Sequence, residues 1–244
     1  MAESETDPKK FLSGNFETLQ AASIFAVSTS KSGKSFTSSR WFRRQEIFYN
    51  ESQNGNTPRP NSLPEIIKNS SANTVIEVGG GSGWIWNLIG RERKSNLKYY
   101  NLELAETCNY FKNLVQIDSS IRFISTIKNL ELNPNDQVIL YANSTLQYLD
   151  NAGLEEIFRT INLCTEALFD ELIFTDFASY WTLQEYYGSK IPYFVRNKSD
   201  FLEFMEIFGF KFEKQVDTDF GNSDGDEATR TYFTESLHFL KVTG

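Results

Sequence analysis

The chain has 244 residues, of which 40% are hydrophobic, so it can bury one sizeable core and is expected to form a single domain with an N-terminal appendage. Its 32 acidic and 24 basic residues leave a net charge of −8, which argues against nucleic-acid binding. There is no apolar run of about 18 residues and no basic leader, so we expect a cytoplasmic protein without a membrane span.

The N-terminal part of the chain is expected to be an accessory region. Apolar spacing predicts two short helices, one from Gly14 to Phe25 and one from Trp41 to Tyr49. The segment Ser52 to Pro64 is rich in proline and asparagine, which is typical of a linker. We therefore assign residues 1–72 to an N-terminal helical extension with its linker, and residues 73–244 to the main domain.

The main domain alternates between strand and helix patterns along the chain. Strands are predicted at 74–78, 97–103, 121–125, 137–142, 171–176, 210–216 and 236–242, and helices at 84–92, 106–116, 151–168 and 199–208. This alternation predicts an α/β fold with a mostly parallel seven-stranded sheet, an antiparallel last strand and helices on both faces.

The first of these strands leads into a turn with four glycines, Gly79-Gly80-Gly81-Ser82-Gly83. Such a turn, between a strand and a helix, brings backbone N–H groups to a ligand at the carboxyl edge of the sheet. A dinucleotide site needs Gly-x-Gly-x-x-Gly, but Trp84 or Trp86 falls where the third glycine should stand. A nicotinamide-dependent oxidoreductase or epimerase is therefore only an alternative interpretation.

The turn resembles a different motif, the acidic-Gly-x-Gly-x-Gly signature of class I S-adenosylmethionine-dependent methyltransferases. The resemblance implies a Rossmann-like fold, S-adenosyl-L-methionine as the cofactor and no metal. It also implies that the cofactor is bound by the acid and glycines of the motif, Glu77, Gly79, Gly80, Gly81 and Gly83. A non-catalytic module that keeps this fold is the second alternative.

Other cofactor contacts are expected where the next strands end. Glu103 lies 20 positions after the last glycine of the turn, where nucleoside-binding α/β folds place a carboxylate for the ribose hydroxyls, and Glu106 could take the same part. Ser125 and Thr126 follow the third strand and are candidates for adenine contacts. Asn143 ends the fourth strand and could bind the cofactor or the acceptor.

A narrower resemblance follows the fourth strand. The segment Ser144-Thr145-Leu146-Gln147-Tyr148-Leu149 is similar to the Ser-x-Leu-Gln-Tyr-Leu signature of a group of bacterial methyltransferases associated with surface-polysaccharide gene clusters. That resemblance implies O-methylation of a small sugar or polysaccharide-precursor acceptor. The group commonly has Asp-Arg-Thr-Pro at the end of the fifth strand, whereas this chain has Phe174-Thr175-Asp176-Phe177-Ala178, which keeps an acid but lacks the arginine. If that arginine contacts an anionic acceptor in the group, the acceptor of this protein is expected to differ.

Methyl transfer mainly requires that the acceptor atom, the methyl carbon and the sulfur lie in line, and a general base helps a hydroxyl acceptor. Asp176, at the end of the fifth strand, and His238, the single histidine, are the candidate catalytic bases. His238 could equally be a packed structural residue. Tyr148, Tyr180 and Tyr193 are candidate acceptor-binding rings, and the oligomeric state stays open.

Overall fold

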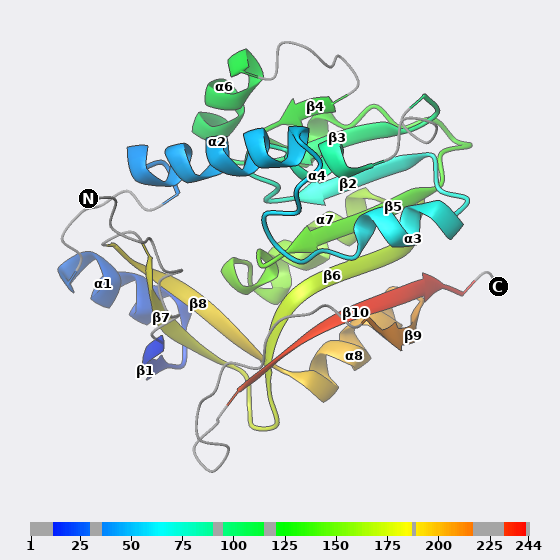
Figure 1. The fold of residues 1–244 in the computed structure, drawn as a ribbon. Helices are drawn as coiled ribbons and strands as arrows, with labels where there is room; N and C mark the ends of the chain where they lie inside the picture. The colour runs from blue at the N-terminus through cyan, green and yellow to red at the C-terminus, as the bar shows by residue number, and fades with distance from the viewer. Residues whose placement is uncertain are drawn as a thin grey trace.

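The computed structural model describes residues 12–29, 36–89, 95–114, 121–186, 189–216 and 232–242 (Figure 1). In chain order the elements are β1 (Leu12–Phe16), α1 (Leu19–Thr29), α2 (Ser39–Gln53), α3 (Leu63–Asn69), β2 (Thr74–Val78), α4 (Ile85–Leu88), β3 (Lys98–Leu102), α6 (Ala105–Leu114), β4 (Ile121–Ile124), η1 (Ile127–Asn129), β5 (Val138–Asn143), η2 (Leu146–Tyr148), α7 (Asn151–Thr160), β6 (Cys164–Thr175), β7 (Tyr180–Tyr186), β8 (Ser189–Asn197), α8 (Lys198–Ile207), β9 (Phe210–Gln215) and β10 (Phe233–Lys241).

The central sheet has the strand order β4-β3-β2-β5-β6-β10-β9. Strand β2 runs parallel to β3 on one side and to β5 on the other. Strand β10 runs antiparallel to β6 and β9. The predicted mostly parallel seven-stranded sheet with an antiparallel last strand is therefore confirmed. Because the strand order reverses at β2, the carboxyl end of β2 is where a ligand crevice is expected.

Alternating side chains of the strands divide the core between the two faces of this sheet. Val75, Ile139 and Leu168 pack with buried residues of α2, α3, α4 and α6. Their strand neighbours Ile76 and Leu140 pack with buried residues of α7 and α8. Figure 1 shows helices on both sides of the sheet, as the alternation of strands and helices predicts. None of the described helices is long and apolar enough to cross a membrane.

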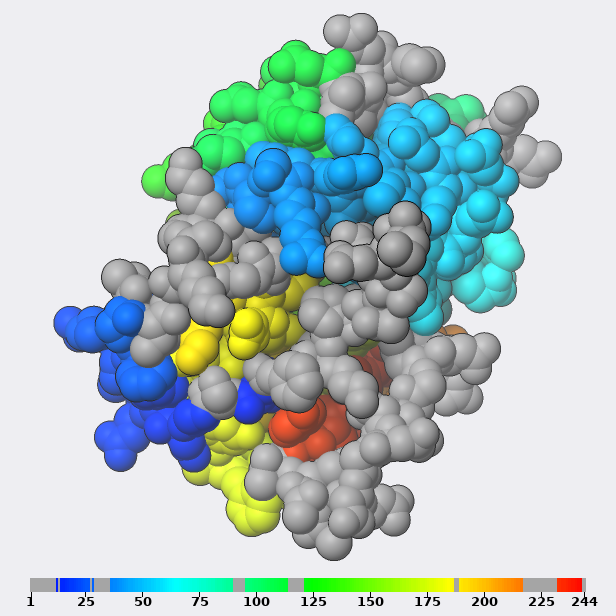
Figure 2. Space-filling view, turned by 60° about the vertical axis from the view of Figure 1, so that its left-hand side comes forward, coloured from blue at the N-terminus to red at the C-terminus, as the bar shows by residue number. Residues whose placement is uncertain are grey.

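A second, smaller sheet was not foreseen. Strands β1, β7 and β8 pair antiparallel, and β8 joins β6 in parallel over two residues. Trp181 and Leu183 of β7 pack against Ala22 and Ala26 of α1, so α1 covers one face of the small sheet. Figure 2 shows β7 and β8 (yellow) between α1 (dark blue) and α2 (lighter blue). The N-terminal region thus contributes a strand as well as helices.

The largest error in the sequence-based assignment lies after α7. The predicted helix 151–168 ends at Thr160, and β6 begins at Cys164 rather than at residue 171. Almost every residue of β6 is buried. A strand that is buried on both faces reads as a continuous apolar run, which periodicity does not distinguish from a buried helix. Helix α4 covers Ile85–Leu88 of the predicted range 84–92, and residues 90–92 lie outside the described part.

Candidate functional site

The glycine turn after β2 has a backbone that only glycine adopts readily. Gly79, Gly81 and Gly83 have φ angles of +69°, +59° and +71°, in the left-handed region. The space that a Cβ atom would fill at the four glycines is already taken by a neighbouring side chain, which is Thr145 at Gly79, Glu77 at Gly80, Gln45 at Gly81 and Ile121 at Gly83. A side chain at Gly79, Gly81 or Gly83 would strain the backbone, and a side chain at Gly80 would displace Glu77.

Glu77 lies directly behind the turn and supports it. Its side chain is 1% exposed, and its Oε2 accepts a 2.7 Å hydrogen bond from the Tyr99 hydroxyl. Burial raises the pKa of Glu77 to about 7, against the opposing effect of the Tyr99 hydrogen bond. Burial also raises the pKa of Tyr99 well above its ordinary value, so this hydroxyl stays the donor.

Asn101 of β3 is a second support, which the sequence analysis did not identify. Its Oδ1 accepts from the Gly80 N–H at 3.2 Å, and its Nδ2 donates to the Gly81 carbonyl at 3.2 Å. The only signal in the sequence is a polar residue between Tyr100 and Leu102, inside the predicted strand 97–103. Such a residue needs hydrogen-bond partners, and here the turn supplies them.

Glu103 stands at the carboxyl end of β3, beside the turn. Its Oε1 accepts from the Gly81 N–H at 2.9 Å, and its Oε2 accepts from the Leu104 N–H at 2.7 Å. Burial raises the pKa of Glu103, although these hydrogen bonds oppose the shift. The residue is thus held next to the glycines, where the sequence analysis expected a ribose-binding carboxylate.

The turn and Glu103 form one wall of a cavity of about 570 Å³. This volume is within the range of roughly 300–1,000 Å³ that is typical of small-molecule sites. Seven of the sequence-predicted residues line the cavity, namely Glu77, Gly79, Gly80, Glu103, Ser125, Asn143 and Tyr148. Sequence reasoning missed the side chains that close it from other elements, which include Trp41, Gln45 and Phe48 of α2, Arg59, Gln184 and Tyr186 of β7, and Ile191 and Pro192 of β8.

Four other predicted residues do not line the cavity but are chain neighbours of residues that do. Gly81 and Gly83 belong to the same turn, and Gly81 is covered by the Gln45 side chain. Thr126 accepts from the Lys128 N–H at 3.4 Å and so begins the short helix η1. Tyr193 is fully buried, with its ring centroid 5.5 Å from that of Tyr148, and its hydroxyl has no hydrogen-bond partner among the described residues.

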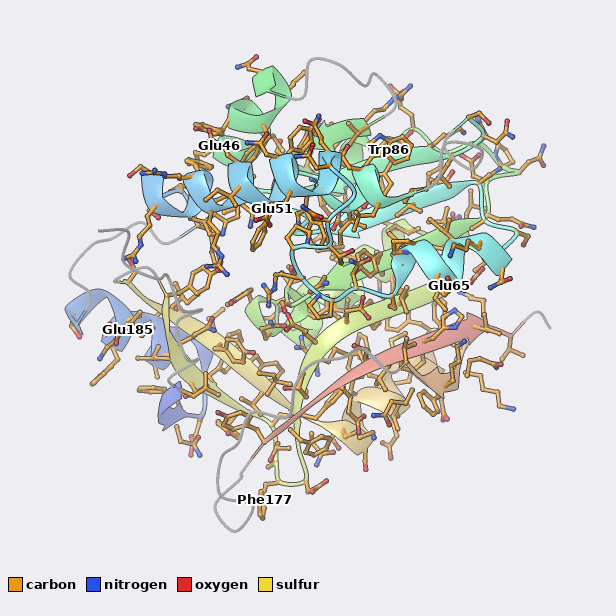
Figure 3. All side chains as sticks on the ribbon, in the orientation of Figure 1. Glu46, Glu51, Glu65, Trp86, Phe177 and Glu185 are labelled. Atoms are coloured by element: carbon orange, nitrogen blue, oxygen red, sulfur yellow. The ribbon has the colours of Figure 1, made fainter. Side chains whose placement is uncertain are left out.

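Asp176 lies outside the cavity. At the level of the site, β5 ends at Asn143, which pairs with Asp170 of β6. Strand β6 then continues to Thr175, so Asp176 is exposed in the turn that follows. Phe177, labelled in Figure 3, marks this turn at the opposite end of the molecule from α2. Because β6 extends five residues beyond the position opposite the end of β5, the end of β6 does not lie at the ligand edge of the sheet.

His238 and Tyr180 also lie away from the cavity. His238 is buried in β10 opposite Leu168, and its Nε2 is 3.1 Å from Glu166 Oε2. Burial by itself would raise the pKa of Glu166, but its hydrogen bonds with His238 and Ser70 outweigh burial and lower this pKa. Tyr180 begins β7 and pairs with Val195 of β8. The structure therefore brings neither candidate base to the glycine turn.

Three polar side chains, Asn143, Arg59 and Glu171, lie near the carboxyl end of β5, and two of them form an ion pair. Asn143 Nδ2 donates to the Pro60 carbonyl at 3.1 Å. Arg59 approaches Glu171 Oε2 at 2.5 Å and the Ser144 hydroxyl at 3.5 Å. The Arg59 guanidinium is thus neutralised by a carboxylate of the protein itself. No three His, Cys, Asp or Glu side chains in the described ranges are grouped so that they could hold a metal ion.

No protein-family model matches the sequence, and no curated protein matches it significantly. Solved structures do match the fold. A 1,6-didemethyltoxoflavin-N1-methyltransferase of Burkholderia thailandensis, with 1,6-didemethyltoxoflavin and S-adenosylhomocysteine bound, aligns with 97% of this chain and 97% of its own at a TM-score of 0.56 and 10% identity. The chain has the fold of S-adenosylmethionine-dependent methyltransferases.

Two further structures agree. An S-adenosylmethionine-dependent methyltransferase of Methanosarcina mazei aligns with 73% of this chain and 98% of its own, at a TM-score of 0.51 and 10% identity. A candidate S-adenosylmethionine-dependent methyltransferase of Listeria monocytogenes aligns with 73% of this chain and 97% of its own, at a TM-score of 0.52 and 15% identity. At these identities the likeness concerns the fold.

Proposed function

We propose that the protein is an S-adenosylmethionine-dependent methyltransferase that O-methylates a small sugar or polysaccharide-precursor acceptor. The observation that carries the proposal is the glycine turn at the carboxyl end of β2, with three glycines in the left-handed region and Glu103 bonded to it. It opens on the 570 Å³ cavity of a methyltransferase fold.

The residues around the cavity fit this cofactor. The glycines allow the left-handed turn that brings Gly79 and Gly80 to the cavity wall, where the amino-acid end of the cofactor would lie. Glu103 has the carboxylate that ribose hydroxyls need, and Ser125 is the polar residue for the adenine edge. Gln45 would bind the cofactor carboxylate through its amide nitrogen. The bound cofactor supplies a methyl group on a positively charged sulfur.

The protein's own part in the reaction is chiefly to orient the acceptor and exclude water. Trp41, Phe48, Tyr148 and Tyr186 give the cavity apolar walls. Holding the acceptor oxygen in line with the methyl group supplies much of the rate of such a displacement. The mechanism uses neither Asp176 nor His238, because both lie outside the cavity.

The saccharide acceptor rests on the resemblance of the Ser144–Leu149 segment to the polysaccharide-associated group. It is supported by the position of Tyr148 in the cavity wall, since aromatic rings pack well on the C–H faces of sugars. A non-catalytic module would share the fold and the turn. Incubation with methyl-labelled cofactor and a panel of sugars distinguishes the two, because only an enzyme transfers the label.

Calorimetric titration with S-adenosylhomocysteine tests the cofactor site. The wild-type protein should bind it, and Gly81→Arg should abolish binding because its side chain collides with Gln45. Gly55→Arg is the matched control, since Gly55 also has a positive φ of +80° but has no atom near its Cβ position. Wild-type protein that fails to bind S-adenosylhomocysteine would rule out the proposed function.

A further inference from the structure

One end of the cavity, which we call the acceptor end, is walled by rings and hydrophobic side chains. Phe36 lies with its ring centroid 4.8 Å from that of Tyr148 and 5.6 Å from that of Tyr186. Ile191 and Pro192 of β8 continue this wall. Trp181 and Leu183 of β7 contact α1, whereas Gln184 and Tyr186 point to the other face of the strand. The acceptor end therefore lies on the face of the small sheet that α1 does not cover.

Gln184 brings a polar group into this apolar surface. It lines the cavity, and only 1% of its surface is exposed. Its Oε1 accepts a 2.6 Å hydrogen bond from the Tyr148 hydroxyl. Burial raises the pKa of Tyr148 well above its ordinary value, so the hydroxyl keeps its proton and the amide oxygen is the acceptor.

The amide nitrogen of Gln184 has no hydrogen-bond partner among the described residues. With Oε1 held by Tyr148, the amide cannot turn round, and Nε2 makes no hydrogen bond to any residue of the described ranges. Nε2 is not one of the fully buried side-chain atoms of the described residues that lack a partner, so a ligand in the cavity can reach it. The arrangement therefore favours a ligand that brings a hydrogen-bond acceptor to this point.

The charges around the cavity decide which kind of acceptor atom fits. Arg59 is the only basic side chain among the described lining residues, and it is paired with Glu171 at 2.5 Å. The other charged lining residues are Glu77 and Glu103. Within the described lining, an anionic ligand group would therefore have no unpaired cation beside it, which is unfavourable. A hydroxyl would bring a proton that also needs a partner, whereas a carbonyl oxygen needs only the donor.

We propose that Gln184 Nε2 donates a hydrogen bond to a neutral carbonyl oxygen of the methyl acceptor, and that in a saccharide this carbonyl belongs to an acetamido group. The methyl group of the acetamide then packs against the Phe36, Tyr148 and Tyr186 rings. This inference rests on the proposed function and narrows its acceptor to an N-acetylated amino sugar. It makes Gln184 a specificity-determining residue.

Saturation-transfer NMR on the protein saturated with S-adenosylhomocysteine tests the ligand class. The probes are the methyl β-glycosides of N-acetylglucosamine, glucose and glucuronic acid. The N-acetylglucosaminide should bind best, with the strongest saturation at its acetamido methyl group, because only this probe has a neutral carbonyl. Equal or stronger binding of the glucoside or the glucuronide, or no binding of the N-acetylglucosaminide, would overturn the inference.

Two substitutions test the role of Gln184. Gln184→Glu keeps an oxygen for the Tyr148 hydroxyl but removes the donor, and Gln184→Met removes the donor without adding charge. Each substitution should weaken binding of the N-acetylglucosaminide about five-fold or more, which is the equivalent of about one hydrogen bond. Gln215→Glu, on the exposed strand β9, is the control and should have no effect.

The experiment distinguishes a failure of the proposed role of Gln184 from a failure of the proposed methyltransferase function. Both Gln184 variants should bind S-adenosylhomocysteine with an affinity within about two-fold of wild type, which also shows that they fold. Unchanged N-acetylglucosaminide binding in both variants would refute the role of Gln184 while the methyltransferase proposal stands. Loss of S-adenosylhomocysteine binding by the wild-type protein would instead reject the proposed function itself.

Discussion

Two glutamine side chains bring amide groups to the cavity from elements outside the central sheet. Gln184 comes from the small sheet, and Gln45 comes from α2. Gln45 Oε1 accepts from the Ser82 N–H at 3.3 Å, and the Gln45 side chain lies over Gly81. Its Nε2 is then the group left to meet a ligand carboxylate, in a site where the only basic lining residue described is already paired.

Gln45→Ala is expected to weaken S-adenosylhomocysteine binding about ten-fold, because a hydrogen bond to a charged group is worth about 1.5–3 kcal/mol. Binding of 5′-methylthioadenosine, which lacks the amino-acid end, should change little. Calorimetry with both compounds measures the difference, and Gln53→Ala on the exposed surface of the same helix is the control. An equal loss for both compounds would mean that Gln45 only supports the turn.

Among the elements, α3, β5 and β6 are joined through one buried carboxylate. Asp170 accepts hydrogen bonds from the Ser62 N–H at 2.7 Å, the Ser62 hydroxyl at 2.6 Å and the Tyr141 hydroxyl at 2.8 Å. Burial raises the pKa of Asp170, while these bonds oppose the shift. The carboxylate thus ties the start of α3 to the sheet beside Asn143 of the cavity wall.

Asp170→Ala should lower the free energy of unfolding by about 3 kcal/mol or more, because it leaves three buried donors without an acceptor. Urea denaturation followed by tryptophan fluorescence measures this loss. Asp176→Ala is the matched control, since Asp176 is exposed and its replacement should change stability by less than about 0.5 kcal/mol. A similar effect of both substitutions would contradict the structural role of Asp170.

For the whole molecule, the buried charge of Glu77 links global stability to pH. The folded-state pKa of Glu77 is about 7, whereas the ordinary pKa of a glutamate is 4.5. Between these values the folded chain keeps a proton that the unfolded chain has released, so stability falls as the pH rises. The contribution of Glu77 is complete below about pH 4.5 and is lost by about pH 7, with a total of about 3 kcal/mol.

Comparison of wild type with Glu77→Gln isolates this effect from other titrating groups. The amide carries no charge at either pH, so its stability should fall less than that of wild type between pH 5 and pH 8. Urea denaturation at the two pH values gives both differences. If the two proteins lose the same free energy of unfolding over this range, Glu77 is ionised in the folded state at low pH and the assignment is wrong.

The parts of this protein that the sequence determined by itself are those with local causes. Short apolar runs that alternate with helix patterns predicted the central sheet, since strands covered on both faces are apolar along their whole length. The glycines predicted the tight turn after β2, because the left-handed backbone at Gly79, Gly81 and Gly83 favours glycine whatever the rest of the chain does. Glu103 followed from its spacing after the turn.

Only the tertiary structure decided which side chains close the cavity. Gln184 meets Tyr148 across 36 positions of sequence, and Gln45 meets Ser82 across 37. No local pattern marks such pairs, because they form only when α2 and the small sheet pack over the carboxyl edge. The same holds for Asp176, which follows the end of β6 and lies beyond the site because β6 is longer than β5. Backbone preferences act within a few residues, whereas the shape of a cavity depends on where distant elements meet.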